Sequence, residues 1–421
     1  MYRRGVRSLK NGHFWKLFAA QIVSTLGDCF GLFALQWFVY TTTGSLVIMG
    51  TLAMTAGVVE LVVRFIGAPL IDRIQRLRLM ALLDAIRFTA IGITVVLSYL
   101  GLVHLWVLFA MAIINAAASA LFQPASMAVL PSFIPKQSLV RGYSLIDASQ
   151  YGAVILGPAI AGFVISSLGA ASALAIDAVS FAISALFIFL IPTRLADSKE
   201  YAPPASGLYY RELWDGITFF KKAPALLGIM ICVAMKNMCS VAVGGMMIPF
   251  AMQHLHANAS QIGLLSSAMA GGICLGSLLV SMINNFKRRR IPMLGSIFAH
   301  GLLYMALSQT SSFMLALCWI VLLGVCGPFF GTFSSSLYAQ MVPSELRGRV
   351  MSARLMVGGS LQPAGSYMGG IIANSYGIPV LLVIAGSIPI LTAFAAYFAP
   401  VMKGIDGELG PIRVETVGLE A

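Results

Sequence analysis

Twelve long apolar stretches recur along this chain of 421 residues, and they restrict its fold more than any other feature. A membrane hydrocarbon core about 30 Å thick is crossed by roughly 20 apolar residues in a helix. Backbone groups have no water to bond inside lipid, so each spanning segment must satisfy them within its own helix. The sequence therefore predicts an all-α integral membrane protein with twelve transmembrane helices. Their expected limits are 14–40, 46–70, 78–100, 105–130, 143–168, 171–192, 224–252, 261–284, 291–309, 313–341, 350–375 and 378–401.

Composition and charge agree with this architecture. Hydrophobic residues make up 59% of the chain and charged residues only 10%, whereas soluble domains are about half apolar and about a quarter charged. The net charge of +12 could indicate a nucleic-acid-binding protein. If the N-terminus is cytoplasmic, however, the six outer loops contain no lysine or arginine, which is the pattern of the positive-inside rule. We therefore expect membrane lipids and no nucleic acid as partners, and both termini on the cytoplasmic side of the membrane.

The twelve spans form two groups of six that resemble one another. The segment "IPKQSLVRGYS" matches "VPSELRGRVMS", and Pro135 and Pro343 lie at nearly the same separation as Pro158 and Pro363. A repeat of this kind is typical of transporters with substrate sites near the membrane midplane. We expect an N-terminal half (1–192), a cytoplasmic linker (193–223), a C-terminal half (224–401) and a cytoplasmic tail (402–421).

Three short segments carry more specific information. The loop after the second span reads "APLIDRIQRL", and the end of the fourth reads "FQPASMAVLPSFIP". The fifth span contains "AVILGPAIAG", with Gly157, Pro158 and Gly162. A Gly-Pro pair removes one amide hydrogen and one side chain, so it allows a bend and a close approach between helices.

These segments resemble motifs of the major facilitator superfamily, and the resemblance covers essentially the whole chain. The first is similar to G-x-L-a-D-R-x-G-R-R, with Ala68 and Gln75 at two glycine positions. The third is similar to the exporter motif G-x-x-x-G-P-x-x-G-G, with Ala153 and Ala161 at glycine positions. The second resembles the branch of drug:proton antiporters that holds macrolide and tetracycline-type efflux pumps and some siderophore exporters. The resemblance implies two six-helix bundles that rock about a central site.

The resemblance also assigns expected roles to residues at the cytoplasmic side. Asp72 can accept hydrogen bonds at a helix N-terminus. Arg73 and Arg76 can pair across the two halves with acids such as Glu345, which lies beside Arg347, and such pairs would hold an inner gate shut. The alternative is that these basic residues only set the topology.

Ionisable residues inside the spans are the candidates for transport chemistry, because each costs roughly 2.5 to 3.5 kcal/mol to insert. Asp84 and Arg87 lie toward the cytoplasmic end of the third span and Asp147 at the start of the fifth, where we expect structural pairing. The role of Asp177, in the outer part of the sixth span, stays open from sequence.

Two deeper charges occupy matching positions of the two halves. Asp28 is midway along the first span, and Lys236, next to Asn237, is midway along the seventh. The resemblance implies that both spans line the central cavity, so these side chains are candidates for coupling or substrate binding. A purely structural ion pair is the alternative. The superfamily often has an arginine linked to proton coupling in the fourth span, and Asn115 occupies that position here, which leaves the proton route open.

Glu60 and Arg64 form the remaining candidate pair, in the second span. They are four residues apart, so they share a helix face and can pair. Glu60 is close in depth to Asp28, and such a carboxylate could exchange a proton for substrate while Arg64 stays charged. The alternative is a pair that only stabilises the helix.

The sequence thus predicts a secondary active transporter, expected to be a monomer, that exports an amphipathic drug-like compound or metabolite against protons or another ion. The chain contains no Walker A sequence, catalytic triad pattern or metal-ligand spacing, so we expect no enzyme, cofactor or metal. The alternatives are a siderophore or peptide exporter, and a facilitator or uptake permease without proton coupling. From other classes, a membrane enzyme or a lipid-binding protein stays possible at this point.

Overall fold

A computed structural model describes residues 12–71, 74–135, 138–192, 214, 216–221, 223–283, 288–343 and 346–406. The secondary structure in this part of the chain is helical, and it contains no strand, which confirms the predicted all-α fold class. Contacts divide the chain into two compact units. The N-terminal unit comprises Met1–Pro203 with Met247–Ala270, and the C-terminal unit comprises Pro204–Met246 with Gly271–Ala421. Each unit is described by itself.

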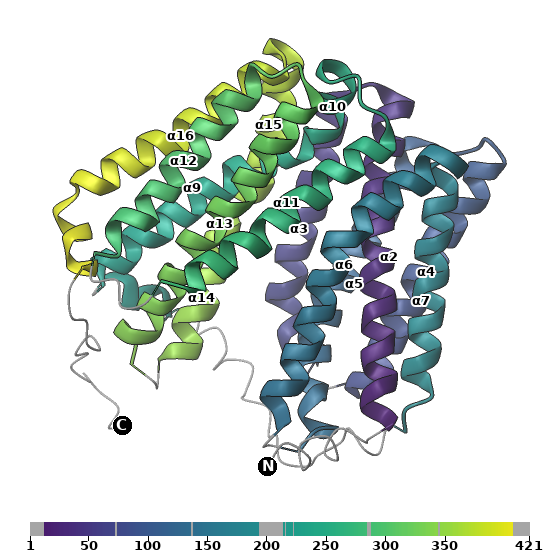
Figure 1. Cartoon of the computed structure of the whole chain (residues 1–421). Coiled ribbons are helices and arrows are strands. Elements are labelled where there is room, and N and C mark those ends of the chain that lie inside the picture. Colours follow the sequence, from purple (N-terminus) through teal and green to yellow (C-terminus); the bar gives the residue numbers. More distant parts are fainter. Residues whose placement is uncertain are drawn as a thin grey trace. The chain divides into compact units, whose positions relative to one another are not determined.

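The N-terminal unit is a bundle of long helices. Its first described helix, α2, packs against both α6 and α7, while α4 packs against α5 and α7, and α3 against α5 (Figure 1). The short helix α10 and the first part of α11 also belong to this unit. The bounds are α2 (Gly12–Thr43), α3 (Leu46–Ile71), α4 (Arg76–Tyr99), α5 (Leu105–Val129), α6 (Leu139–Leu168), α7 (Ala170–Phe189), α10 (Met247–His254) and α11 (Ala259–Ser281).

The C-terminal unit repeats this plan with other residues. Helix α12 packs against α13 and α16, and α9 packs against α14, α15 and α16 (Figure 1). Gly301 and Gly386 bring α12 and α16 together, since a Cβ on Gly386 would lie 2.6 Å from the Gly301 carbonyl oxygen. The bounds are α9 (Pro224–Gly245), α12 (Arg290–Ser308), α13 (Phe313–Met341), α14 (Arg347–Ser360), α15 (Gln362–Tyr376), α16 (Ile378–Phe398) and a final 3₁₀ helix η4 (Pro400–Ile405).

Two of the twelve predicted segments are broken helices. The predicted span 350–375 consists of α14 and α15, which meet at Leu361, and the predicted span 224–252 consists of α9 and α10, which meet at Met246. Pro363 near the start of α15 has no amide hydrogen for the helix ladder, and glycine pairs precede both breaks. Eleven described helices are long and apolar enough to cross a membrane; neither α14 nor α15 alone meets that length.

Candidate functional site

Two glycines of α2 leave space for the carboxyl group of a residue on α7. Gly27 and Gly31 lie one turn apart on α2, against Asp177 and Ser180 of α7. A Cβ on Gly31 would collide with the Asp177 carboxylate oxygens, and one on Gly27 with the Ser180 hydroxyl. Small residues allow such close contact between membrane helices. Asp177 is therefore only 1% exposed, and its Oδ1 has no hydrogen-bond partner among the described residues.

A second buried acid and an arginine lie on α4. Asp84 and Arg87 are 0% and 2% exposed and 3.9 Å apart, and the Ser184 hydroxyl of α7 donates to Asp84 Oδ2 over 2.6 Å. The Arg87 guanidinium lies over the rings of Phe122 and Phe181, at 5.5 and 4.9 Å from their centroids. Aromatic faces attract such a cation. The predicted pairing of Asp84 with Arg87 is present, and both side chains are buried inside the unit.

Arg87 is the positively charged residue with which three acids of this cluster interact. Arg87 interacts electrostatically with Asp84, with Asp177 and with Asp28. If every group were ionised, one positive charge would face three negative charges in a medium where an unpaired charge is costly. A carboxyl group that holds a proton carries no charge, so the cluster is neutral when two of its three acids are protonated. Protonation of these acids would thus set the net charge of the cluster.

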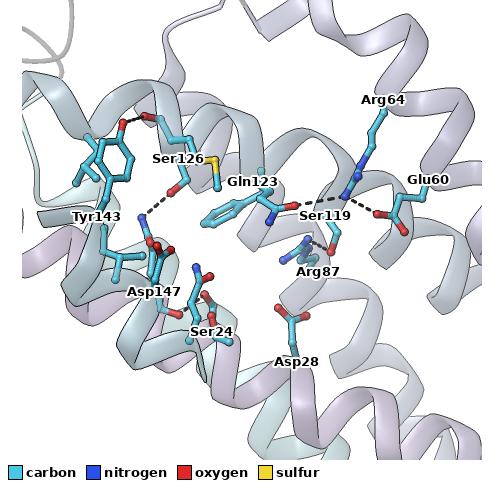
Figure 2. Close-up of a pocket in the computed structure, with 17 residues that line it drawn as sticks. Ser24, Asp28, Glu60, Arg64, Arg87, Ser119, Gln123, Ser126, Tyr143 and Asp147 are labelled. Atoms are coloured by element: carbon cyan, nitrogen blue, oxygen red, sulfur yellow. Dashed lines mark hydrogen bonds and ion pairs between the residues drawn. The ribbon is translucent and has the colours of Figure 1, made fainter. Parts of the chain in front are cut away.

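Two residues of this cluster, Asp28 and Arg87, line a cavity of about 340 Å³. Figure 2 shows Asp28 and Arg87 directed into the same part of the cavity, with Ser119 beside the guanidinium. Arg87 Nη2 donates a hydrogen bond to the Ser119 hydroxyl. Nearby, Gln21 of α2 donates to Ser126 of α5 over 2.5 Å. The other lining residues are Ser24, Thr25, Glu60, Arg64, Phe122, Gln123, Met127, Leu130, Tyr143, Ile146, Asp147 and Gln150.

The pair predicted in the second span lies on the wall of the same cavity. Glu60 Oε1 is 2.6 Å from Arg64 Nη2, so the predicted ion pair between these residues is confirmed. The same nitrogen donates to Gln123 Oε1 of α5 over 3.3 Å (Figure 2). Both members of the pair are about half exposed, in contrast to Asp84 and Arg87. This pair can therefore be reached by a ligand or by solvent without unfolding the bundle.

The cation beside Asp28 was not identified from the sequence. The resemblance directed attention to Asn115 of α5, which does not line the cavity and whose Oδ1 is buried without a hydrogen-bond partner in the described structure. The positive charge comes instead from Arg87 of α4 and reaches Ser119, one turn along α5 from Asn115. The signal available in the sequence was the spacing of Asp84 and Arg87, which places both side chains on one helix face.

The exporter motif packs α6 against two neighbours. A Cβ on Gly157 would lie 2.6 Å from Cys29 Cβ of α2. On another face, Gly162 contacts the backbone of α11 at Ala259, and the Pro158 carbonyl contacts Gly263. The Ala159 amide donates to the Ser267 hydroxyl of α11 over 3.0 Å, which satisfies a donor next to the proline. The close helix approach expected from these residues is present within the N-terminal unit.

The other predicted site residues have separate surroundings. Asn237 of α9 donates to the Gly358 carbonyl of α14 over 3.0 Å, so its side chain joins two helices. Lys236 lies on the same helix and has no hydrogen bond or ion pair among the described residues. Because Asp28 and Lys236 belong to different units, their predicted juxtaposition stays a prediction.

The predicted gate is described only in part. Asp72, Arg73 and Glu345 lie outside the described residues. Arg76 is the first residue of α4, and Arg347, the first of α14, donates to the Ala339 carbonyl over 3.0 Å. The pairing of the two loops across the halves therefore remains a prediction.

Solved structures share this fold. The nucleoside transporter NupG aligns with a TM-score of 0.73 at 15% identity, over 91% of this chain and 98% of that one. A bacterial homologue of the human lysosomal transporter Spinster, in an inward-facing and unoccupied conformation, aligns with a TM-score of 0.71 at 16% identity, over 95% and 99%. At these identities the likeness shows the fold alone.

Curated relatives cover nearly the whole chain. Macrolide efflux protein A of Streptococcus pyogenes is 20% identical over 93% of this chain and 97% of its own length. Multidrug efflux pump Tap of Mycolicibacterium fortuitum is 23% identical over 94% and 98%. The family model described as transmembrane secretion effector matches residues 5–412. The chain thus belongs to the transmembrane secretion effector family of the major facilitator superfamily, and it is a multi-pass membrane transporter of small molecules rather than an enzyme.

Proposed function

We propose that this transporter exports an amphipathic organic compound in exchange for protons, and that Asp28 carries the exchanged proton. The carrying observation is the cluster in which Arg87 serves three carboxyl groups, one of which, Asp28, lines the cavity. The relatives named for macrolide and multidrug efflux support export of drug-like compounds. Glu60 and Arg64 lie on the same wall and supply further polar contacts for a ligand.

The exchange follows from charge balance. When Asp28 and one of the other two acids hold protons, the remaining carboxylate balances Arg87, and the cavity wall at Asp28 is neutral. Loss of that proton adds a negative charge beside Arg87 and changes how the cavity attracts a ligand. A ligand and a proton can then alternate at one place, which is the requirement for antiport. Rocking of the two halves about such a site would move them in opposite directions.

We assign the inner gate to Asp72, Arg73 and Arg76 with Glu345 and Arg347. In this scheme Pro158 and Gly162 of the exporter motif hold α6 against α11, and Gly157 holds it against α2. We also propose that the protein works as a monomer in a bacterial inner membrane, with both termini cytoplasmic as the charge bias indicates. Reporter fusions at each terminus test the orientation, and a reporter active only outside the cytoplasm would contradict it.

The decisive experiment uses inside-out vesicles that contain a pH-sensitive dye and are energised by respiration. Macrolides, tetracyclines, dye cations and siderophores are added in turn to vesicles with wild type, Asp28→Asn, Glu60→Gln or Asp147→Asn. We expect substrate-evoked proton release from the lumen, lost in Asp28→Asn and retained in Asp147→Asn, because Asp147 is exposed at the cavity and lies outside the Arg87 cluster. Loss in Glu60→Gln would add Glu60 to the route.

Substrate accumulation without proton release would instead favour another coupling ion or a facilitator. A siderophore or peptide exporter is the second candidate for the cargo. It is favoured by Lys236, which has no partner among the described residues, since a charged cargo needs a countercharge inside the membrane. An uptake permease would show the opposite direction of net flux in the same vesicles.

A further inference from the structure

Lys236 is a basic side chain without a partner among the described residues of the C-terminal unit. Between Pro224 and Val401 the sequence contains a single acid, Glu345, in the connection before α14. The one acid of this unit that the structure describes, Asp406, is joined to Arg290 at the start of α12. Lys236 lies in the middle of α9, far along the helix from either end. An ammonium group at such a position requires an acceptor.

A histidine and a tyrosine of α12 face the same region. Lys236 and Ser240 are one turn apart on α9, and His300 and Tyr304 are one turn apart on α12. Tyr304 donates to the Ser240 hydroxyl over 3.4 Å, which joins the two faces. Lys236 and His300 interact electrostatically, and the His300 and Tyr304 rings meet edge to face at 5.1 Å. Two bases and an aromatic ring thus form one cluster.

Both ring nitrogens of His300 lack a hydrogen-bond partner in the described structure, although the residue is only 3% exposed. A neutral imidazole has one donor and one acceptor nitrogen, and an ammonium has three donors. Buried polar groups are normally bonded. Cys326 of α13, the remaining titratable group that interacts with Lys236, offers only a weak thiol acceptor. The cluster therefore lacks what an oxyanion would supply, namely negative charge and acceptor oxygens.

We infer that Lys236 and His300 form an anion-binding site that holds a carboxylate or similar acidic group of the exported compound. The inference rests on the proposed export function and adds a substrate class to it, an amphiphile that bears an acid. The Lys236 ammonium would bond the carboxylate directly, and His300 would donate from one ring nitrogen. Tyr304, held by its bond to Ser240, packs edge to face against His300 and orients the imidazole ring.

Arg354 provides a matched control in the same unit. This cation lies over the Tyr338 ring at 4.4 Å and donates to the Ser334 hydroxyl over 2.9 Å. Its bonding capacity is thus used by neutral groups of the protein, whereas that of Lys236 is not. If the positive charge of the unit mattered only in general, removing either cation would have the same effect.

The test measures binding of two dyes to purified protein, without any proton gradient. One is a rhodamine with a free carboxylate and the other is its methyl ester. We expect Lys236→Met to weaken binding of the carboxylate dye about tenfold or more, and that of the ester less than about twofold. Lys236→Arg should retain the preference, His300→Phe should reduce it, and Arg354→Met should leave it unchanged. Equal weakening of both dyes by Lys236→Met, or no weakening, would overturn the inference.

The same experiment with anionic phosphatidylglycerol separates cargo from lipid. Competition by the lipid for the carboxylate dye in the wild type, absent in Lys236→Met, would mean that the anion is a lipid headgroup and would overturn the assignment to cargo. Dye binding does not depend on proton coupling, so it can be measured even if no proton release is observed. The anion site and proton-coupled export can therefore be tested separately.

A stability measurement decides the matter where neither dye binds. A lysine awaiting a ligand has no internal partner, so Lys236→Met should leave the apo protein as stable as the wild type or more stable. If Lys236 instead pairs with an acid such as Asp28, Lys236→Met should lower the unfolding temperature, and adding Asp28→Asn should restore it. That second result would replace the anion site by a structural ion pair.

Discussion

The two units place opposite chemistry inside the membrane. In the N-terminal unit Arg87 lies 3.9 Å from Asp84 and over two aromatic rings, and it interacts electrostatically with Asp28 and Asp177. In the C-terminal unit Lys236 and Arg354 have no described acid near them, and neutral groups or nothing at all contact their charges. The two halves resemble each other in sequence, but the buried ionisable groups are mainly acidic in the first and basic in the second. Under our proposals, one half handles protons and the other handles the acidic group of the cargo.

The strongest test of this contrast is Arg87→Met. Removing the guanidinium leaves buried acids without a cation, and breaking such a pair costs about 3–5 kcal/mol. The matched control is Arg64→Met, since the Glu60–Arg64 pair is about half exposed and such pairs contribute about 0–1 kcal/mol. Thermal unfolding of the purified variants measures both.

Adding Asp84→Asn to Arg87→Met should recover part of the loss, because one orphaned charge is removed. Equal losses of stability in Arg87→Met and Arg64→Met would show that the buried cluster contributes no more to stability than the exposed pair on the cavity wall. That result would contradict the contrast between the units.

A second test concerns the crossing of α6 and α11 within the N-terminal unit. Gly162→Leu would force a side chain into the backbone at Ala259, and overpacking of this kind costs about 1–3 kcal/mol. Gly152→Leu is the control on the same helix, because a Cβ at Gly152 meets nothing within 4 Å. Unfolding temperatures should fall for the first variant only. A similar fall in both would mean that α11 does not approach α6 as described.

A smaller effect is expected for Tyr338→Phe in the C-terminal unit. The Tyr338 hydroxyl donates to the Leu226 carbonyl over 3.0 Å, and loss of one neutral hydrogen bond costs about 0.5–1.5 kcal/mol. The ring remains as a platform for Arg354, so that cation should stay in place. Tyr338→Ala removes both interactions and should destabilise more. If the two variants are equally stable, the ring does not hold Arg354.

The smallest effect should follow Asp406→Asn, which removes one charge from the pair with Arg290. The amide oxygen still accepts from the Arg290 backbone amide, a bond of 2.9 Å, so only the ionic part is lost, about 0.2–1 kcal/mol. Because salt screens such pairs, the difference from wild type should shrink when the ionic strength is raised. A difference that stays constant with salt would assign the stabilisation to packing of η4 instead.

The sequence predicted the helices better than their interruptions. Apolar length identifies a span, but the breaks at Leu361 and Met246 depend on how glycine and proline are tolerated by neighbouring helices, which a single segment does not reveal. The pairing of Glu60 with Arg64 was predictable because both lie on one helix. The notch of Gly27 and Gly31 around Asp177 was not, since it joins the first helix to the sixth of the half and requires knowledge of which helices touch.

The notch in α2 has a consequence for biogenesis. The first helix enters the membrane with Asp28 and two bare glycines at mid-length, and its complementary surface on α7 is synthesised last of the six helices in this half. Until α7 emerges from the ribosome, that polar face must be shielded by the insertion machinery or by other helices. Chains truncated before α7 should therefore remain substrates for quality-control proteases. The N-terminal half is expected to fold only once all six of its helices have been synthesised.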